Sequence, residues 1–116
     1  MQKVYVVAPY RSAVASFQGS LKDLSAAQLG AQVVKGVLEK ANIAPDLVDQ
    51  VFFGNVLTAG QGQNPARQVA VAAGIPCEVP AMTVGKVCGS GMTAVSLAAS
   101  LCIGGGMGEA SLYKLV

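Results

Sequence analysis

The chain has 116 residues, of which 53% are hydrophobic and only 12% charged, a length and composition that exclude a multidomain machine and a disordered chain. No apolar stretch approaches the roughly 20 residues that a membrane span needs, so we expect no membrane segment. The 8 basic and 6 acidic residues give a net charge of +2 without a basic run, which argues against nucleic acid or anionic lipid as a partner. The apolar excess in so small a domain predicts association with another chain.

The cysteines argue against a metal site. Cys77, Cys88 and Cys102 are odd in number, none has C-x-x-C spacing, and the chain contains no histidine. The usual zinc-site patterns therefore cannot be built, and we expect no bound metal. No signal peptide or peroxisomal ending is visible, so the default expectation is a reducing cytoplasm with free thiols. Mitochondria and peroxisomes stay open as locations.

The first half of the chain predicts a strand, a helix and a second strand. Residues 4–8 are mostly β-branched or aromatic, which is typical of a buried strand. After a polar loop, apolar residues recur at helical spacing from residue 26 to about 41, with Ser25 as the N-cap. Residues 48–53 then predict another strand. Together they predict a parallel unit with a right-handed crossover.

The second half predicts two more helices and three strands. Asn64 suits an N-cap before a helix over 65–73, and residues 81–84 predict a strand. A further helix would open at Cys88 and run to about residue 100.

The chain then ends in two expected strands, over 101–103 and 110–116, joined by a glycine turn over 104–108. The predicted order is βαβαβαββ. We therefore expect an α/β fold in which helices pack on a mixed sheet, with residues 1–116 forming one domain.

Cys88 is the strongest candidate for chemistry. It lies between an expected strand and an expected helix, next to Gly89. Unpaired N–H groups and the positive end of the dipole at a helix start stabilise negative charge, which suits a nucleophilic thiol. Cysteine is also a small buried residue in many cores, so spacing alone leaves both interpretations open.

Cys102 is a weaker candidate from the residues alone. The following GGGMG could present backbone N–H groups to an oxyanion, but glycines also suit any tight hairpin. This glycine run is not a dinucleotide-binding fingerprint, because no helix follows it. Cys77 lies between Pro76 and Glu78 and has no visible activating feature.

Four segments carry a family resemblance. SLKDLSAAQLG, VFFGNVLTAGQGQNPARQVAVAAGIP, VPAMTVGKVCGSGMTAVSLAA and LCIGGGMG resemble the thiolase family, which comprises acetyl-CoA acetyltransferases and 3-ketoacyl-CoA thiolases. Residues 1–99 resemble the N-terminal part of a thiolase and residues 100–116 its extreme C-terminal strands. The middle of the family chain is expected to be absent. The fold implied is a single thiolase-like half-fold.

The resemblance implies a role for each matching residue. Cys88 corresponds to the nucleophile that takes the acyl group, and Cys102 to the acid/base. The backbone N–H groups of Cys88 and Gly104 correspond to an oxyanion hole. Coenzyme A thioesters are implied as substrates, with no further cofactor. The family also uses a histidine, which this chain lacks, so we expect the chain to be incomplete as an independent catalyst.

Three interpretations of function follow. The first is a thiolase-like acyltransferase polypeptide that forms a cysteine thioester in acetoacetyl-CoA formation or thiolysis. The second is a non-catalytic shortened thiolase chain that pairs with itself or with an intact thiolase as a dimerisation module, and the third is a shortened product with no evolved task. Because a helix separates Cys88 from Cys102, we also expect their sulfurs to lie more than about 10 Å apart within one chain.

Overall fold

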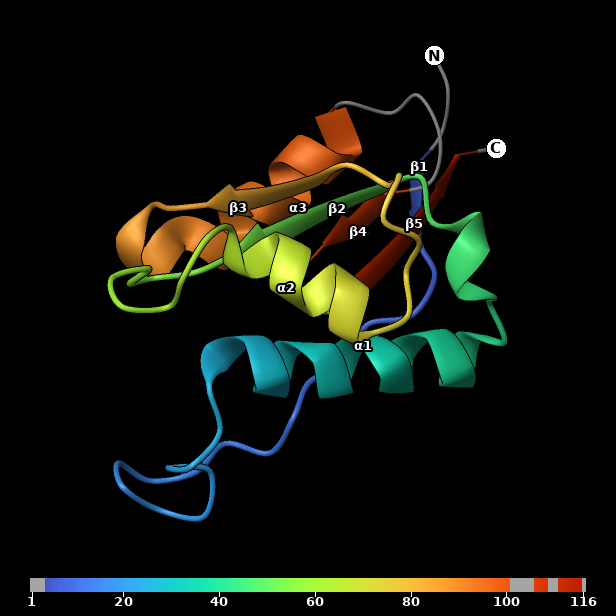
Figure 1. Cartoon of the computed structure of the whole chain (residues 1–116). Helices are drawn as coiled ribbons and strands as arrows, with labels where there is room; N and C mark the ends of the chain where they lie inside the picture. The colour runs from blue at the N-terminus through green and yellow to red at the C-terminus, as the bar shows by residue number, and fades with distance from the viewer. Residues whose placement is uncertain (1–3, 101–105, 109–110, 116) are drawn as a thin grey trace.

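The computed structural model describes residues 4–100, 106–108 and 111–115, and it has the predicted α/β order (Figure 1). Two short 3-10 turns are also present, one between the first helix and the second strand and one between the third strand and the third helix. The elements are β1 (Val4–Val6), α1 (Ala26–Ala41), η1 (Pro45–Leu47), β2 (Gln50–Gly54), α2 (Pro65–Ala72), β3 (Ala81–Val84), η2 (Val87–Gly89), α3 (Ser90–Ser100), β4 (Gly106–Gly108) and β5 (Ser111–Leu115).

The strands form a mixed five-stranded sheet in the order β1-β5-β4-β2-β3. β2 pairs in parallel with β3 and β4, with Val51 opposite both Ala81 and Met107. β5 is antiparallel to β4 and to β1. β1 and β2 therefore run in the same direction, as the expected unit required. They are not neighbours in the sheet, because β4 and β5 lie between them.

Helices cover both faces of the sheet, as the alternation of side chains along β2 requires. Val51 and Phe53 point to one face, where they belong to a core formed with α1 and α2. Phe52 points to the other face and belongs to a second core with Val84 and the α3 residue Ala94. Figure 1 shows α1 and α2 on one side of the sheet and α3 on the other.

The helix starts follow the local sequence closely. Ser25 caps α1 through a capping box, in which its side chain accepts from the Gln28 N–H and the Gln28 side chain accepts from the Ser25 N–H. The Asn64 side chain caps α2 by accepting from the Arg67 N–H, and Pro65 is the first helical residue. Both predicted helix starts are confirmed to the residue.

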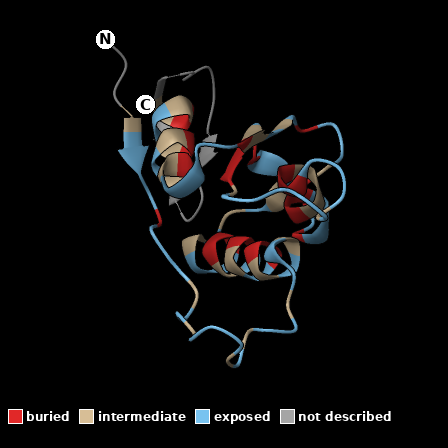
Figure 2. Ribbon diagram, turned by 90° about the vertical axis from the view of Figure 1, so that its left-hand side faces the viewer, coloured by how far each residue is buried: buried red, intermediate tan, exposed pale blue. Residues whose placement is uncertain are grey.

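The prediction that residues 4–8 form a buried strand is wrong in two respects. The strand ends at Val6, and Tyr5 and Val6 are 49% and 54% exposed, whereas Ala8 is buried. The reason is topological, because β1 is an edge strand that pairs with β5 alone among the described strands. Figure 2 shows it as an exposed strand at one side of the molecule.

The other strand predictions also need adjustment. The second strand begins at Gln50 instead of residue 48, because η1 precedes it. The glycine turn expected over 104–108 is wrong for its second half, where Gly106–Gly108 forms β4. Backbone pairing on both sides, with β2 and β5, holds this glycine-rich strand in the sheet. The strand expected over 101–103 lies outside the described residues.

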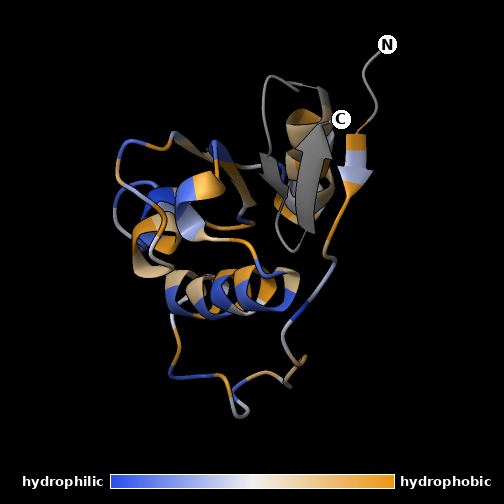
Figure 3. Ribbon diagram, turned by 90° about the vertical axis from the view of Figure 1, so that its right-hand side faces the viewer, coloured by the Kyte–Doolittle hydropathy of each residue, from blue (hydrophilic) through white to orange (hydrophobic). Residues whose placement is uncertain are grey.

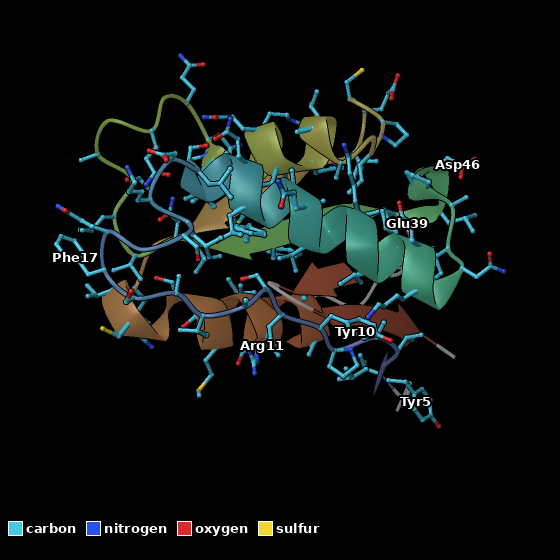
Figure 4. All side chains as sticks on the ribbon, turned by 90° about the horizontal axis from the view of Figure 1, so that it is seen from below. Tyr5, Tyr10, Arg11, Phe17, Glu39 and Asp46 are labelled. Atoms are coloured by element: carbon cyan, nitrogen blue, oxygen red, sulfur yellow. The ribbon has the colours of Figure 1, made fainter. Side chains whose placement is uncertain are left out.

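A long loop over residues 7–25 joins β1 to α1, and hydrophobic residues occur along it (Figure 3). Val14 and Phe17 are 87% and 95% exposed. The first part of the loop is held to the last turn of α1, where the Lys40 ammonium lies 4.5 Å from the centre of the Tyr10 ring. Figure 4 shows Tyr10 beside the C-terminal half of α1 and Phe17 at the opposite side of the molecule.

Candidate active site

Cys88 lies in η2, the turn between β3 and α3, and is exposed. The sequence predicted that Cys88 would open the helix, but α3 begins two residues later at Ser90. The turn is closed by a hydrogen bond of 2.9 Å from the Gly89 N–H to the Lys86 carbonyl. Cys88 therefore stands immediately before the N-terminus of an 11-residue helix.

The backbone of the Cys88 turn has an unusual conformation at Val87, whose φ is +47°. A β-branched residue is strongly disfavoured in the left-handed region, because its Cβ lies too close to the backbone. Such a conformation persists only where surrounding interactions hold it.

Ser90 supplies those interactions and is itself buried, with 2% exposure. Its Oγ accepts from the Lys86 N–H at 2.8 Å, and it lies 2.7 Å from the Val87 carbonyl oxygen and 3.3 Å from that of Asn55. A single hydroxyl thus contacts Lys86 and Val87, the two residues before Cys88, and also Asn55, the residue after β2.

Two glycines bring the end of β2 close to the start of α3. A Cβ on Gly54 would lie 2.6 Å from the Gly91 nitrogen and 2.7 Å from its Cα, closer than real Cβ atoms approach. The two backbones can approach this closely only because residue 54 has no side chain. This contact places Asn55 within reach of Ser90.

Cys88 opens onto a cavity of about 750 Å³, within the range of small-molecule sites. Its walls come from the loop after β1, from α1, from the end of β2 and from α3. Most of the wall is apolar, with a few polar groups. The residues that line it include Arg11, Ser12, Leu29, Gly30, Phe53, Asn55, Cys88, Ser90, Met92 and Val95.

Cys88, which lines this cavity, has an unpaired backbone N–H. Within the described part of the chain it donates no hydrogen bond, whereas the neighbouring Gly89 N–H is used in closing the turn. An unpaired N–H beside a helix start is the kind of donor that stabilises an oxyanion. The thiol and an unpaired backbone N–H thus belong to one residue that lines the cavity.

Comparison with known proteins identifies the family. The profile described as "Thiolase, N-terminal domain" matches residues 4–109 of this chain. The chain belongs to the thiolase family. It is 53% identical over 105 residues to an acetyl-CoA acetyltransferase of Cupriavidus necator. This match covers 90% of this chain and 27% of that protein.

This thiolase-family chain is also similar to a second acetyltransferase sequence and to a solved thiolase structure. It is 51% identical over 92 residues to an acetyl-CoA acetyltransferase sequence of Clostridioides difficile, covering 79% of this chain and 86% of that sequence. The solved structure of the Acat5 thiolase from Ascaris suum in complex with coenzyme A matches with a TM-score of 0.79 and 36% identity, covering 84% of this chain and 25% of that one. The chain spans about a quarter of the Cupriavidus and Ascaris proteins.

The remaining candidates of this thiolase-family chain are Cys102, Gly104 and Cys77. Cys102 and Gly104 lie outside the described residues, so their roles and the expected separation of the Cys88 and Cys102 sulfurs stay predictions. Cys77 is exposed in the linker before β3, where its carbonyl accepts from the Arg67 guanidinium at 3.2 Å.

Among the described residues, no group of three or more His, Cys, Asp and Glu side chains is placed to hold a metal ion. In the same part of the chain, no helix is long and apolar enough to cross a membrane.

Sequence reasoning missed two residues of this candidate site, Ser90 and Asn55. Their importance comes from a contact between positions 35 residues apart. No local pattern signals that contact. The one available hint is the glycine at position 54 next to Asn55, since glycine at a strand end often marks a close backbone approach.

Proposed function

We propose that this chain takes an acyl group from an acyl-CoA thioester onto the sulfur of Cys88, the first half-reaction of a thiolase-type acyltransferase. The observation that carries the proposal is the position of Cys88, with its thiol and unpaired N–H before α3 at the mouth of the cavity. The acetyl-CoA acetyltransferase relatives and the coenzyme A bound in the Ascaris structure support the choice of substrate.

The step transfers the acyl group from the thioester of acyl-CoA to the Cys88 sulfur, which forms a new thioester. The Cys88 thiolate attacks the carbonyl carbon, a new C–S bond forms, and the bond to the sulfur of coenzyme A breaks. The Cys88 N–H donates to the carbonyl oxygen as negative charge develops on it. Coenzyme A leaves as a thiolate and takes up a proton from water, which balances the proton that the Cys88 thiol releases to water when it ionises. The resemblance assigns acid/base work to Cys102 and a second oxyanion donor to the Gly104 N–H.

The proposed reaction of this 116-residue chain is a single acylation. The chain contains no histidine, and loss of a positioned general base costs roughly 10²- to 10⁴-fold in rate. We therefore expect one acyl group per chain and no sustained acetoacetyl-CoA thiolysis. Coenzyme A thioesters enter as substrates, and no other cofactor is part of the proposal.

The test is incubation of the folded chain with acetyl-CoA, followed by peptide mass mapping. We expect the mass of one acetyl group on the Cys88 peptide, absent in Cys88→Ser and unchanged in Cys77→Ser. Hydroxylamine, which cleaves thioesters, should remove it. A folded chain that stays unlabelled, or that is labelled equally at Cys77, would contradict the proposal.

A second candidate, a dimerisation module, is favoured by the position of β3 at an edge of the sheet. Pro80 and Val84 direct their carbonyls to β2, accepting from the Val51 and Asn55 N–H groups. Because backbone groups alternate along a strand, Ala81 and Thr83 direct theirs away from the sheet. This edge offers backbone pairing to another strand. The proposed partner is a second copy of this chain or an intact thiolase.

A further inference from the structure

Ser90 connects three segments that meet at the Cys88 turn. Its hydroxyl contacts Lys86 after β3, Val87 inside η2 and Asn55 after β2. Figure 1 shows the carboxyl ends of β2 and β3 converging on the start of α3. A change at Ser90 therefore acts on the backbone that carries the thiol, although no contact between Ser90 Oγ and the sulfur is present.

The hydrogen bonds of Ser90 account for the conformation of Val87. The hydroxyl accepts from the Lys86 N–H at 2.8 Å and has one hydrogen to donate, for which the Val87 carbonyl at 2.7 Å is the nearer acceptor. Lys86 and Val87 are thus held from the same buried atom. Without it, Val87 has a steric reason to leave the left-handed region, and Cys88 would move with it.

We propose that Ser90 is the positioning residue of the Cys88 turn, holding Val87 in its left-handed conformation and so fixing the thiol before the start of α3. This deepens the proposed acyl transfer at Cys88 and rests on it for its functional meaning. The positioning itself is measured with iodoacetamide, which needs no acyl-CoA. A chain that fails to accept an acetyl group can therefore still confirm or contradict the role of Ser90.

The experiment compares the alkylation rates of two thiols in the same molecule. Cys77 is exposed and remote from Ser90 in sequence, so the Cys88/Cys77 rate ratio is the readout and the Cys77 rate is the internal standard. We expect Ser90→Ala to lower this ratio roughly two- to fivefold, to the value of the urea-denatured chain. Ser96→Ala is the matched control, because Ser96 is on the same helix and its hydroxyl donates to the Met92 carbonyl instead.

A second substitution separates positioning from a general loss of stability. Glycine adopts a positive φ without the penalty that valine suffers. Val87→Gly in the Ser90→Ala background should therefore restore the Cys88/Cys77 ratio to that of the unmodified chain. A folded Ser90→Ala variant with an unchanged ratio, or a folded double variant with no recovery, would overturn the proposal.

Amide hydrogen exchange in the unmodified chain keeps the proposal testable if these variants do not fold. The Lys86 N–H donates to a buried hydroxyl, whereas the Cys88 N–H has no acceptor within the described residues. We expect the Lys86 amide to exchange at least tenfold more slowly than the Cys88 amide. Equal exchange at the two positions would show that Ser90 does not hold the turn.

Discussion

At the scale of single residues, Cys88 and Cys77 are both exposed thiols that differ in their surroundings. Cys77 is in a linker. Cys88 lies two residues before the start of α3, and the Lys86 side chain lies against its turn, with Cδ 3.7 Å from the position of a Cβ on Gly89. The positive end of the α3 dipole therefore lies beside Cys88 and not beside Cys77.

We therefore predict that iodoacetamide alkylates Cys88 faster than Cys77 in the folded chain. The helix-end interaction predicts a roughly two- to fivefold difference at low salt. Peptide mass mapping over time gives both rates from one sample. The difference should disappear in denaturant, where the helix is lost. Equal rates in a chain shown by circular dichroism to be folded would remove the case for an activated thiol.

At the scale of elements, α1 approaches the sheet closely at one glycine and not at another. A Cβ on Gly30 would lie 2.6 Å from Cζ of Phe53 and 2.9 Å from Cγ2 of Val69, so this position has no room for a side chain. Gly36 lies six residues further along the same helix, and a Cβ added there would have no atom within 4 Å. Gly30 thus permits close packing, whereas at Gly36 the absence of a side chain only weakens the helix.

The two glycines predict opposite effects of the same substitution. Gly36→Ala should raise the free energy of unfolding by about 0.5–1 kcal/mol, because alanine favours the helix and restricts the unfolded chain. Gly30→Ala should lower it by about 1–3 kcal/mol, because a methyl group overpacks the contact with Phe53 and Val69. Urea unfolding followed by circular dichroism measures both. A destabilised Gly36→Ala or a neutral Gly30→Ala would contradict the packing described.

Elements set by local contacts could be predicted from the sequence, whereas those set by distant contacts could not. The starts of α1 and α2 were predicted correctly because Ser25 and Asn64 act on N–H groups three residues away. The exposure of β1 could not be predicted, because it depends on which strand lies beside it. For the same reason β4 was mistaken for a turn, since its glycines are strand residues only through pairing with β2 and β5. Ser90 needed a contact with the distant Asn55.

At the scale of the whole molecule, the sheet begins and ends with edge strands of different character. β1 pairs with β5, so strands from the two ends of the chain lie side by side at one edge. β3 forms the other edge, near the Cys88 turn. Its Met82 is 51% exposed, and Val87 in the following turn is 64% exposed. Apolar side chains beside an unpaired strand are a template for another chain.

One side chain already occupies part of this edge. The Asn64 amide donates to the Ala81 carbonyl at 3.0 Å, and its oxygen accepts from the Thr83 hydroxyl at 2.7 Å. The Ala81 N–H and the backbone groups of Thr83 still point away from β2 by the alternation of the strand. Pairing with a second copy therefore centres on Thr83.

We predict that the folded chain forms a dimer at micromolar concentration through antiparallel pairing of β3 with β3 of a second copy. Met82→Lys should weaken the dimer at least about tenfold, because pairing around a two-fold axis brings the two new charges close together. Leu47→Lys is the matched control, since Leu47 is 67% exposed in η1, outside the sheet, and the substitution adds the same charge. Sedimentation equilibrium gives the mass and dissociation constant of all three proteins. A monomeric unmodified chain with native circular dichroism would contradict the pairing, as would equal weakening of the dimer by both lysines, because a charge effect unrelated to β3 would then account for the change.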